Sequence, residues 1–199
     1  NGGEALTEAK NSYIYSDWMC VRESENDMFK LSGADIFMKS SGRDLCELGS
    51  VSCLLRRQTA FDFEAGVIVK LPALCEKQNA GMVCYYDENS YVKFGVFMEE
   101  NGAYVEVLEH VIDVERRQKH RISDNVSALK LHIKTEGNVR TFSYECGDMS
   151  GEFILDELEY LCDEGLKFGK RFTGAMVGIY AYSGQGEAFT CEFRDFVIE

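Results

Sequence analysis

The chain contains one proline, Pro72, and no stretch rich in serine, glycine or charge of one sign. Such stretches mark linkers between folding units, so their absence indicates a single compact domain. Apolar runs are short, and none approaches the roughly 20 residues that span a bilayer. These absences argue against a multidomain chain and against a membrane-spanning helix within these residues.

Positive charge is also scarce, with 21 Lys and Arg against 34 Asp and Glu and a net charge of -13. An acidic chain repels phosphate backbones and anionic lipid headgroups, so nucleic acid and membrane surfaces are not expected partners. The first residues, Asn1 to Glu4, have neither the basic region nor the apolar core of a signal peptide. We therefore expect a cytoplasmic protein.

Metal-binding cysteine patterns are missing. No C-x-x-C pair occurs, and the three histidines are not clustered with cysteines, so no structural zinc site is predicted. A domain of this size needs no disulfide staples, and the cysteines fall singly in apolar, strand-like runs. We predict that they are buried, reduced thiols. The eight are Cys20, Cys46, Cys53, Cys75, Cys84, Cys146, Cys162 and Cys191.

Catalytic signatures are absent as well. There is no Gly-x-Ser-x-Gly elbow, no phosphate-binding loop and no recognisable nucleophile triad. A sandwich glycosidase needs two suitably spaced carboxylates, often on one strand as Glu-x-Asp-x-x-Glu. The nearest match is Glu25 and Asp27, with Lys30 in the third position, and a solvated turn is the better interpretation. We assign no catalytic residue.

Calcium is the one cofactor for which the sequence offers ligands. Asp87 and Asn89 supply two oxygen ligands in a turn, whereas calcium takes six to eight. A hairpin turn explains this pair better, so no cofactor and no metal site is expected.

Alternating apolar and polar residues, rich in β-branched and aromatic side chains, recur along most of the chain. The Asn101-Gly102 step is a strong hairpin signal. Residues 153–162 alone favour a short helix. Many strands with short turns predict an all-β fold, an antiparallel two-sheet jelly-roll sandwich. The predicted strands are 60–71, 81–86, 91–97, 103–108, 129–134, 139–144, 175–182 and 188–198.

Two groups of side chains are candidates for binding. Trp18, Tyr85 and Tyr86 are candidate sugar platforms, although aromatic residues on sandwich strands are more often core. Tyr85 and Tyr86 must point to opposite faces of their strand. Arg56 and Arg57 precede a strand and cannot both enter an apolar core. A structural ion pair is slightly favoured over ligand contact, with the other guanidinium turned toward a partner surface.

Three blocks resemble a known family in order and spacing. They are residues 48–65 (LGSVSCLLRRQTAFDFEA), 79–86 (NAGMVCYY) and 172–178 (FTGAMVG). Together they resemble the C-terminal concanavalin A-like domain of family 43 β-xylosidases. The resemblance runs from about Trp18 to Phe196. It departs from the family at Ala60, where a histidine is common, and at Arg194, where an acid is common.

The resemblance implies a lead-in segment over residues 1–17 and a sandwich over residues 18–199. In the family, this sandwich follows a five-bladed β-propeller that holds the catalytic carboxylates and cleaves xylosyl or arabinosyl residues. It therefore implies an accessory, non-catalytic module whose partner is that propeller, in the same or a separate chain. Gln58, with the two arginines before it, is expected to contact the partner domain or the substrate pocket.

The basic, glycine-hinged segment 165–172 precedes the third block. Family members close the propeller pocket with an aromatic side chain from this region, which implies that Phe168 or Phe172 contacts the catalytic domain. In the alternative, Phe172 packs into the sandwich and Phe168 caps it.

Two other functions remain open. One is an independent carbohydrate-binding, lectin-like module, which would bind oligosaccharide without a partner domain. The other is a free-standing sandwich glycosidase. Binding of xylooligosaccharides by the isolated chain would favour the first of these alternatives.

Overall fold

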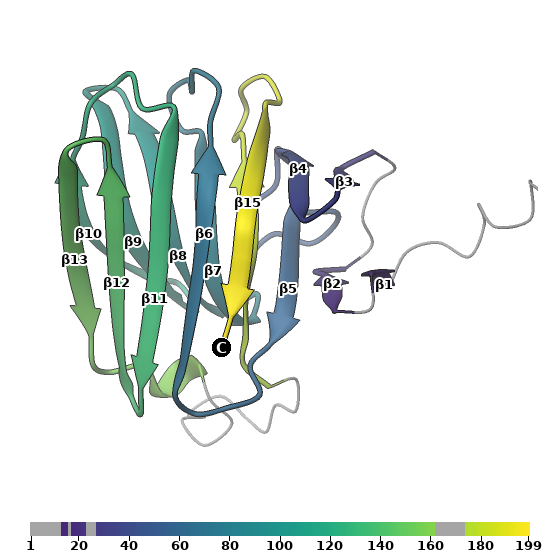
Figure 1. The fold of residues 1–199 in the computed structure, drawn as a ribbon, viewed down its shortest axis with the longest axis vertical. Coiled ribbons are helices and arrows are strands. Elements are labelled where there is room, and N and C mark those ends of the chain that lie inside the picture. The colour runs from purple at the N-terminus through teal and green to yellow at the C-terminus, as the bar shows by residue number, and fades with distance from the viewer. Residues whose placement is uncertain (1–12, 16, 23–26, 162–173) are drawn as a thin grey trace, which may run out of the picture.

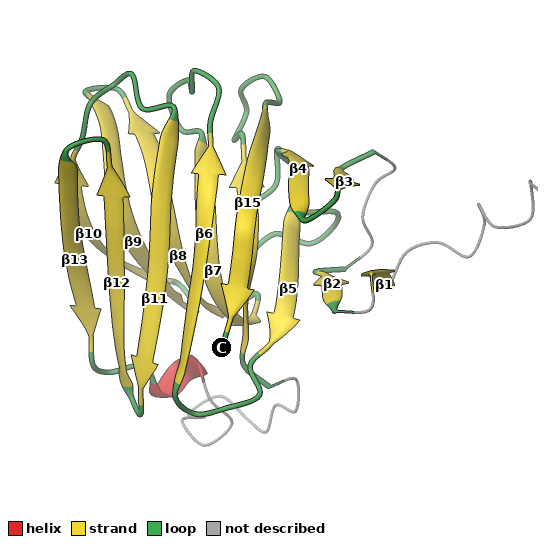
Figure 2. Cartoon of the chain, in the orientation of Figure 1, coloured by secondary structure: helices red, strands yellow, loops and turns green. Residues whose placement is uncertain are grey.

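The computed structural model describes residues 13–15, 17–22, 27–161 and 174–199. In these ranges the chain forms two antiparallel sheets that pack face to face (Figures 1 and 2). Sheet A has eight strands in the order β1-β2-β5-β14-β7-β8-β9-β10, and sheet B has seven in the order β13-β12-β11-β6-β15-β4-β3. The predicted all-β, two-sheet sandwich is confirmed.

The strands are mostly long and regular. Sheet A consists of β1 (Tyr13–Tyr15), β2 (Trp18–Cys20), β5 (Cys53–Arg57), β14 (Met176–Tyr182), β7 (Asn79–Asp87), β8 (Ser90–Glu99), β9 (Gly102–Val111) and β10 (Val114–Arg121). Sheet B consists of β13 (Met149–Leu155), β12 (Val139–Cys146), β11 (Ala128–Glu136), β6 (Phe63–Lys70), β15 (Thr190–Ile198), β4 (Asp35–Lys39) and β3 (Phe29–Ser32). A single 3-10 turn, η1 (Glu159–Leu161), completes the described elements.

Several segments differ from the sequence-based expectation. Strands β2, β3, β4 and β5 are absent from the predicted strands, and Arg56 and Arg57, expected to precede a strand, are the last two residues of β5. The helix expected over residues 153–162 is wrong, because its first residues belong to β13 and only η1 is helical. Strand β10 was not predicted, because its sequence, VERRQKHR, is almost entirely polar and lacks alternation. In the structure all eight of its residues are exposed. It forms because it pairs along its whole length with β9. Strand β1 lies ahead of the predicted start of the sandwich at Trp18.

The core lies between the two sheets and follows the period of two. On β11, Leu131 and Ile133 are buried, whereas His132 and Lys134 face outward. Across the sandwich, the ring of Phe94 on β8 meets that of Phe142 on β12 edge to face, 5.4 Å between centroids. Such pairs add about 0.5–1.5 kcal/mol beyond the burial of their area.

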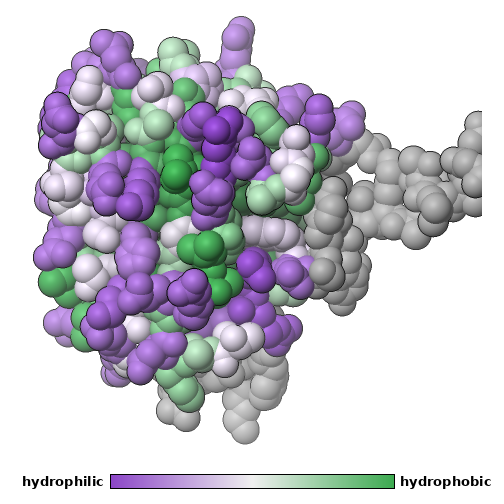
Figure 3. Space-filling view, viewed as in Figure 1, coloured by the Kyte–Doolittle hydropathy of each residue, from purple (hydrophilic) through white to green (hydrophobic). Residues whose placement is uncertain are grey.

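The outer faces of the two sheets differ. The outer face of sheet B is largely polar, with a small apolar spot at Ile68 and Val197 that lines a shallow groove (Figure 3). The outer face of sheet A instead carries a second apolar cluster, which includes Tyr85 and Tyr91 and is partly covered by Leu45 of the segment 40–52.

Helices long and apolar enough to cross a membrane do not occur in the described ranges. Seven of the eight cysteines lie in the described residues, where no disulfide occurs, and Cys162 lies outside them. The predicted burial holds for Cys53, Cys84, Cys146 and Cys191 but is wrong for Cys46 and Cys75, which are exposed.

Candidate functional site

One end of the sandwich gathers the family-like residues. There the β5–β6 connection, the β11–β12 turn and η1 lie next to one another, at the bottom of Figure 1. We call it the η1 end, defined by residues 58–62, 137–138 and 158–161. It contains a pocket of about 500 Å³, lined by Phe61, Arg140 and Leu161 among others. The ring of Phe61 is 90% exposed.

Gln58 fixes the loop that carries Phe61. Its backbone N–H donates to the carbonyl of Ala175, 3.1 Å away, just before β14. Its side-chain Nε2 donates to the carbonyl of Ala60 at 2.8 Å, and its Oε1 accepts from Nη2 of Arg140 at 3.2 Å. With backbone and both side-chain atoms bonded, Gln58 is a structural support for the loop, which holds the exposed phenyl ring in place.

Arg56 and Arg57 point to opposite faces of β5, as neighbouring residues on a strand must. Arg56 is half-buried, lies 3.6 Å from the carboxylate of Asp17 and stacks over the ring of Trp18 at 5.8 Å. Arg57 is exposed. Both line a second pocket of about 480 Å³ that adjoins the loop of Gln58 on its other side. Arg56 therefore forms a structural ion pair, and Arg57 faces solvent.

Arg140 is a functional candidate that sequence reasoning missed. It is buried on the core side of β12, and its guanidinium lies 5.6 Å from the centroid of Phe63. Deeper in the same end, Tyr160 donates from its hydroxyl to Oε2 of Glu109 at 2.8 Å. Burial raises the pKa of Tyr160, so the phenol stays protonated and remains a donor. The sequence did contain a signal for it: in the alternating strand 139–144, Arg140 falls on the same side as Phe142 and Tyr144, which face the core.

The predicted sugar platforms are covered in the structure. Trp18 is buried against Phe196, with 4.7 Å between ring centroids. Tyr86 lies in the core, and Tyr85 lies on the outer face of sheet A beneath other apolar side chains. Tyr85 and Tyr86 thus point to opposite faces, and neither ring is open to solvent. Their role in sugar binding stays a prediction.

Two further candidates lie outside the described residues, which end at Leu161 and resume at Gly174. These are Phe168 and Phe172. The described residues Leu161 and Ala175 both line the η1-end pocket.

Metal chemistry finds little support in the geometry. No group of three or more His, Cys, Asp or Glu side chains within the described ranges is arranged to hold a metal ion. At the β7–β8 turn, Asp87 Oδ1 accepts the backbone N–H of Asn89 at 2.8 Å. That bond is the usual Asx-turn contact of a hairpin.

The fold and this end together define a class: an antiparallel concanavalin A-like sandwich with an anchored, solvent-exposed aromatic loop. A family model described as the β-xylosidase C-terminal concanavalin A-like domain matches residues 10–199. The chain belongs to this family, and the resemblance seen in the sequence is confirmed.

Solved structures agree with this membership. The chain is 25% identical to the family 43 protein BlXynB from Bacillus licheniformis, with a TM-score of 0.84 over 94% of this chain and 37% of that one. It is 17% identical to a xylan β-1,4-xylosidase from Bacillus halodurans C-125, with a TM-score of 0.82 over 95% of this chain and 38% of that one. The chain thus spans little more than a third of these enzymes. No curated protein sequence matches it.

The fold also makes up nearly all of another solved chain. A functionally unknown protein from Saccharomyces cerevisiae is 12% identical, with a TM-score of 0.68 over 92% of this chain and 94% of that one. This likeness concerns the fold only.

Proposed function

We propose that the chain is a non-catalytic accessory module of a family 43-type glycosidase that acts on xylosyl or arabinosyl substrates. It docks through the η1 end against a five-bladed propeller, stabilises that propeller and shapes the mouth of its substrate pocket. The observation that carries the proposal is Phe61, an almost fully exposed phenyl ring on a loop anchored by Gln58.

Physical chemistry favours a covered state for this ring. Burial of a phenylalanine side chain contributes about 1.5–3 kcal/mol. A single exposed apolar residue is ordinary on a protein surface, but Phe61 lines one pocket and the exposed Arg57 lines a second, and the two pockets share Thr59 and Ala60. An aromatic anchor with an arginine next to it is the composition of an interface hot spot.

Family membership supports the same arrangement. The matching model is by name a C-terminal domain, and the solved relatives are more than twice the length of this chain. The remaining length of those proteins leaves room for a catalytic domain. For the present chain, the propeller is the proposed partner, in the same or a separate polypeptide.

Binding measurements test the docking surface. The chain is titrated into the family 43 propeller encoded with it, and the affinity of the wild type is compared with that of Phe61→Ala and Arg57→Ala. Loss of an interfacial aromatic anchor is expected to weaken binding at least tenfold, about 1.4 kcal/mol. Leu48→Ala is the matched control, since Leu48 is also strongly exposed but lies on the segment 40–52 outside the η1 end.

The proposal predicts that Phe61→Ala weakens the complex and Leu48→Ala does not. Equal binding by all variants, or no complex between the wild-type chain and the propeller, would overturn it. Melting temperatures of the three variants are expected to match the wild type, because Phe61, Arg57 and Leu48 are all solvent-exposed.

A further inference from the structure

A separate pocket lies on the outer face of sheet A and shares no lining residue with the pockets around Phe61. It has a volume of about 400 Å³, within the roughly 300–1,000 Å³ usual for small-molecule sites. Its walls come from β8, β9, β10 and β14 and from the segment 40–52 that covers part of this face. Among the lining residues are Asp44, Asn79, Lys93, Arg117 and Tyr182.

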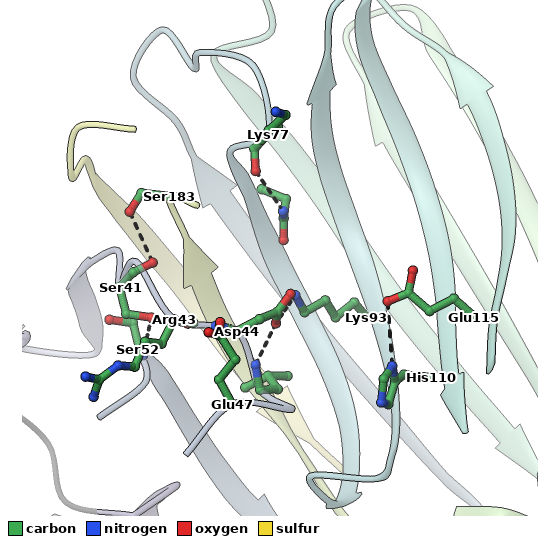
Figure 4. A network of polar contacts seen from close by, with 12 residues as sticks. Ser41, Arg43, Asp44, Glu47, Ser52, Lys77, Lys93, His110, Glu115 and Ser183 are labelled. Carbon is green, nitrogen blue, oxygen red and sulfur yellow. Dashed lines mark hydrogen bonds and ion pairs between the residues drawn. The ribbon is translucent and has the colours of Figure 1, made fainter. Parts of the chain in front are cut away.

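The centre of this pocket is a buried lysine. Lys93 on β8 is only 1% exposed, and its ammonium group forms an ion pair with Asp44 (Figure 4). The same ammonium lies 5.0 Å from the ring centroid of Tyr180 and 4.9 Å from that of Tyr182. A lysine taken out of water at this depth requires partners for all three of its protons. The ion pair with Asp44 accounts for one.

The sheet makes room for the lysine through two glycines. Strand register sets Tyr180, Gly81, Gly95 and Glu106 in one row across β14, β7, β8 and β9. A Cβ atom on Gly81 would collide with the carbonyl oxygen of Phe94, and one on Gly95 with that of Ala80. The glycines carry no side chain, so only backbone separates Tyr180 from Glu106 in this row. Lys93 lies two residues before Gly95 on β8, and its side chain extends over this backbone to the rings of Tyr180 and Tyr182.

Buried polar atoms without a hydrogen-bond partner in the described part of the chain occur on the strands of this face. Glu106 is fully buried: Arg117 Nη1 donates to its Oε1 at 3.0 Å, while its Oε2 has no partner among the described residues. The Tyr180 hydroxyl and Asn79 Oδ1 are likewise buried without a hydrogen-bond partner in the described part of the chain. Each such group costs about 1–3 kcal/mol if left unsatisfied. They include both donors and acceptors. Asn79 lines the pocket, and Tyr180 and Glu106 lie in the row of the two glycines on the same sheet.

The charge around the pocket restricts its ligand. The lining residues carry five carboxylates against three cations, so an anionic ligand is repelled. An apolar ligand would give no hydrogen bond to Lys93 and Asn79, two buried polar groups that line the pocket. Neutral hydroxyl groups both donate and accept, and a sugar also offers C–H faces to rings such as Tyr182 and Phe97.

We infer that this pocket is a binding site for a neutral saccharide, with Lys93, Asp44 and Asn79 as hydrogen-bonding residues and Tyr182 as the apolar wall. The site is independent of the proposed docking through the η1 end. It would give the module an affinity for oligosaccharide of its own, on a face away from the proposed propeller contact.

Titration of the 199-residue chain with xylotriose tests the inference. Binding is measured by heteronuclear NMR and by calorimetry. Saturable binding in the millimolar range or tighter is expected. Lys93→Met keeps the aliphatic stem but removes the donor, and should weaken binding at least tenfold. Tyr182→Ala is the second variant, because Tyr182 is half-buried and its truncation disturbs the core less if Lys93→Met fails to fold.

Two comparisons complete the test. Phe61→Ala is the matched control and should bind xylotriose like the wild type, since Phe61 is remote from this pocket; failure of docking and failure of sugar binding are thereby separated. Trigalacturonic acid, of similar size but anionic, should not bind. Absence of saturation with xylotriose and with cellotriose, unchanged affinity of both pocket variants, or tighter binding of trigalacturonic acid would overturn the inference.

Discussion

Arg140 Nη2 donates to Gln58 Oε1 at 3.2 Å, joining residues 82 positions apart in the chain. The contact connects the β5–β6 loop, which carries Phe61, to β12 of sheet B. Because Arg140 is buried, its replacement by a smaller side chain would leave Gln58 Oε1 without this donor and create a cavity beside Phe63. Contacts within the sandwich therefore fix the conformation of the proposed docking loop before any partner binds.

Replacement of Arg140 should therefore destabilise the domain. Arg140→Met is expected to lower the free energy of unfolding by about 1–3 kcal/mol, because a buried polar group loses its partner. For a domain of this size, each kcal/mol shifts Tm by about 2–4 °C. Thermal unfolding measures the change, with Arg116→Met on the exposed strand β10 as the control. Equal Tm values for the two variants would contradict the structural role of Arg140.

The β10–β11 connection should make stability pH-dependent. The Arg121 side chain and the Ala103 N–H, both bonded to Asp124, lower the pKa of that carboxyl from 3.8 to about 2. A lowered folded-state pKa contributes stability above the unfolded value, and this contribution is lost as pH falls from about 4 to about 2. Asp124→Asn should therefore unfold at a lower temperature than the wild type at pH 6, with most of the difference lost by pH 2. Asp113→Asn, in an exposed turn, is the control; a difference that persists unchanged at pH 2 would refute the assignment.

The isolated chain should not hydrolyse aryl xylosides or aryl arabinofuranosides. Its sequence offers no carboxylate pair suited to glycoside cleavage, and the buried carboxylate of Glu106 accepts a hydrogen bond from Arg117. Release of the aryl group is followed against a buffer blank. Turnover that disappears in Glu106→Gln would instead make the chain a free-standing sandwich glycosidase.

The cysteines should titrate as thiols. Burial raises the pKa of Cys53, Cys84 and Cys191, which slows their reaction in the folded protein. The exposed Cys46 and Cys75 should react first, and denaturation without reductant should release close to all eight. Recovery of four or fewer would indicate disulfides and an oxidising compartment.

The segment before β14 should matter for catalysis in the enzyme that contains a propeller. If Phe168 or Phe172 closes the substrate pocket, its replacement by alanine lowers kcat/KM by roughly tenfold or more, about 1.4 kcal/mol, with little change in Tm. Phe61→Ala in the same enzyme is a useful comparison, because it should weaken docking. Full activity of both the Phe168 and the Phe172 variant, or loss of activity only through unfolding, would count against pocket closure.

Local pattern was sufficient for most of the fold. Alternation on β11 predicts that Leu131 and Ile133 are buried and that His132 and Lys134 are not, because neighbouring residues on a strand face opposite sides. The Asn101-Gly102 step predicts the β8–β9 hairpin, and Gly102 indeed has a positive φ of 124°. The Arg-Arg-Gln block predicts the family, but not that Gln58 is a structural support.

Only the tertiary structure decided the rest. Strand β10 has no pattern of its own and exists because β9 offers it hydrogen-bonding partners. Lys93 alternates with apolar neighbours like any outward-facing polar residue, yet it is buried because the segment 40–52, distant in sequence, folds over it and supplies Asp44. Sequence determines which side of a strand a residue takes, since that depends on backbone geometry alone. Whether that side meets water depends on which remote segment covers it, and only long-range packing sets that.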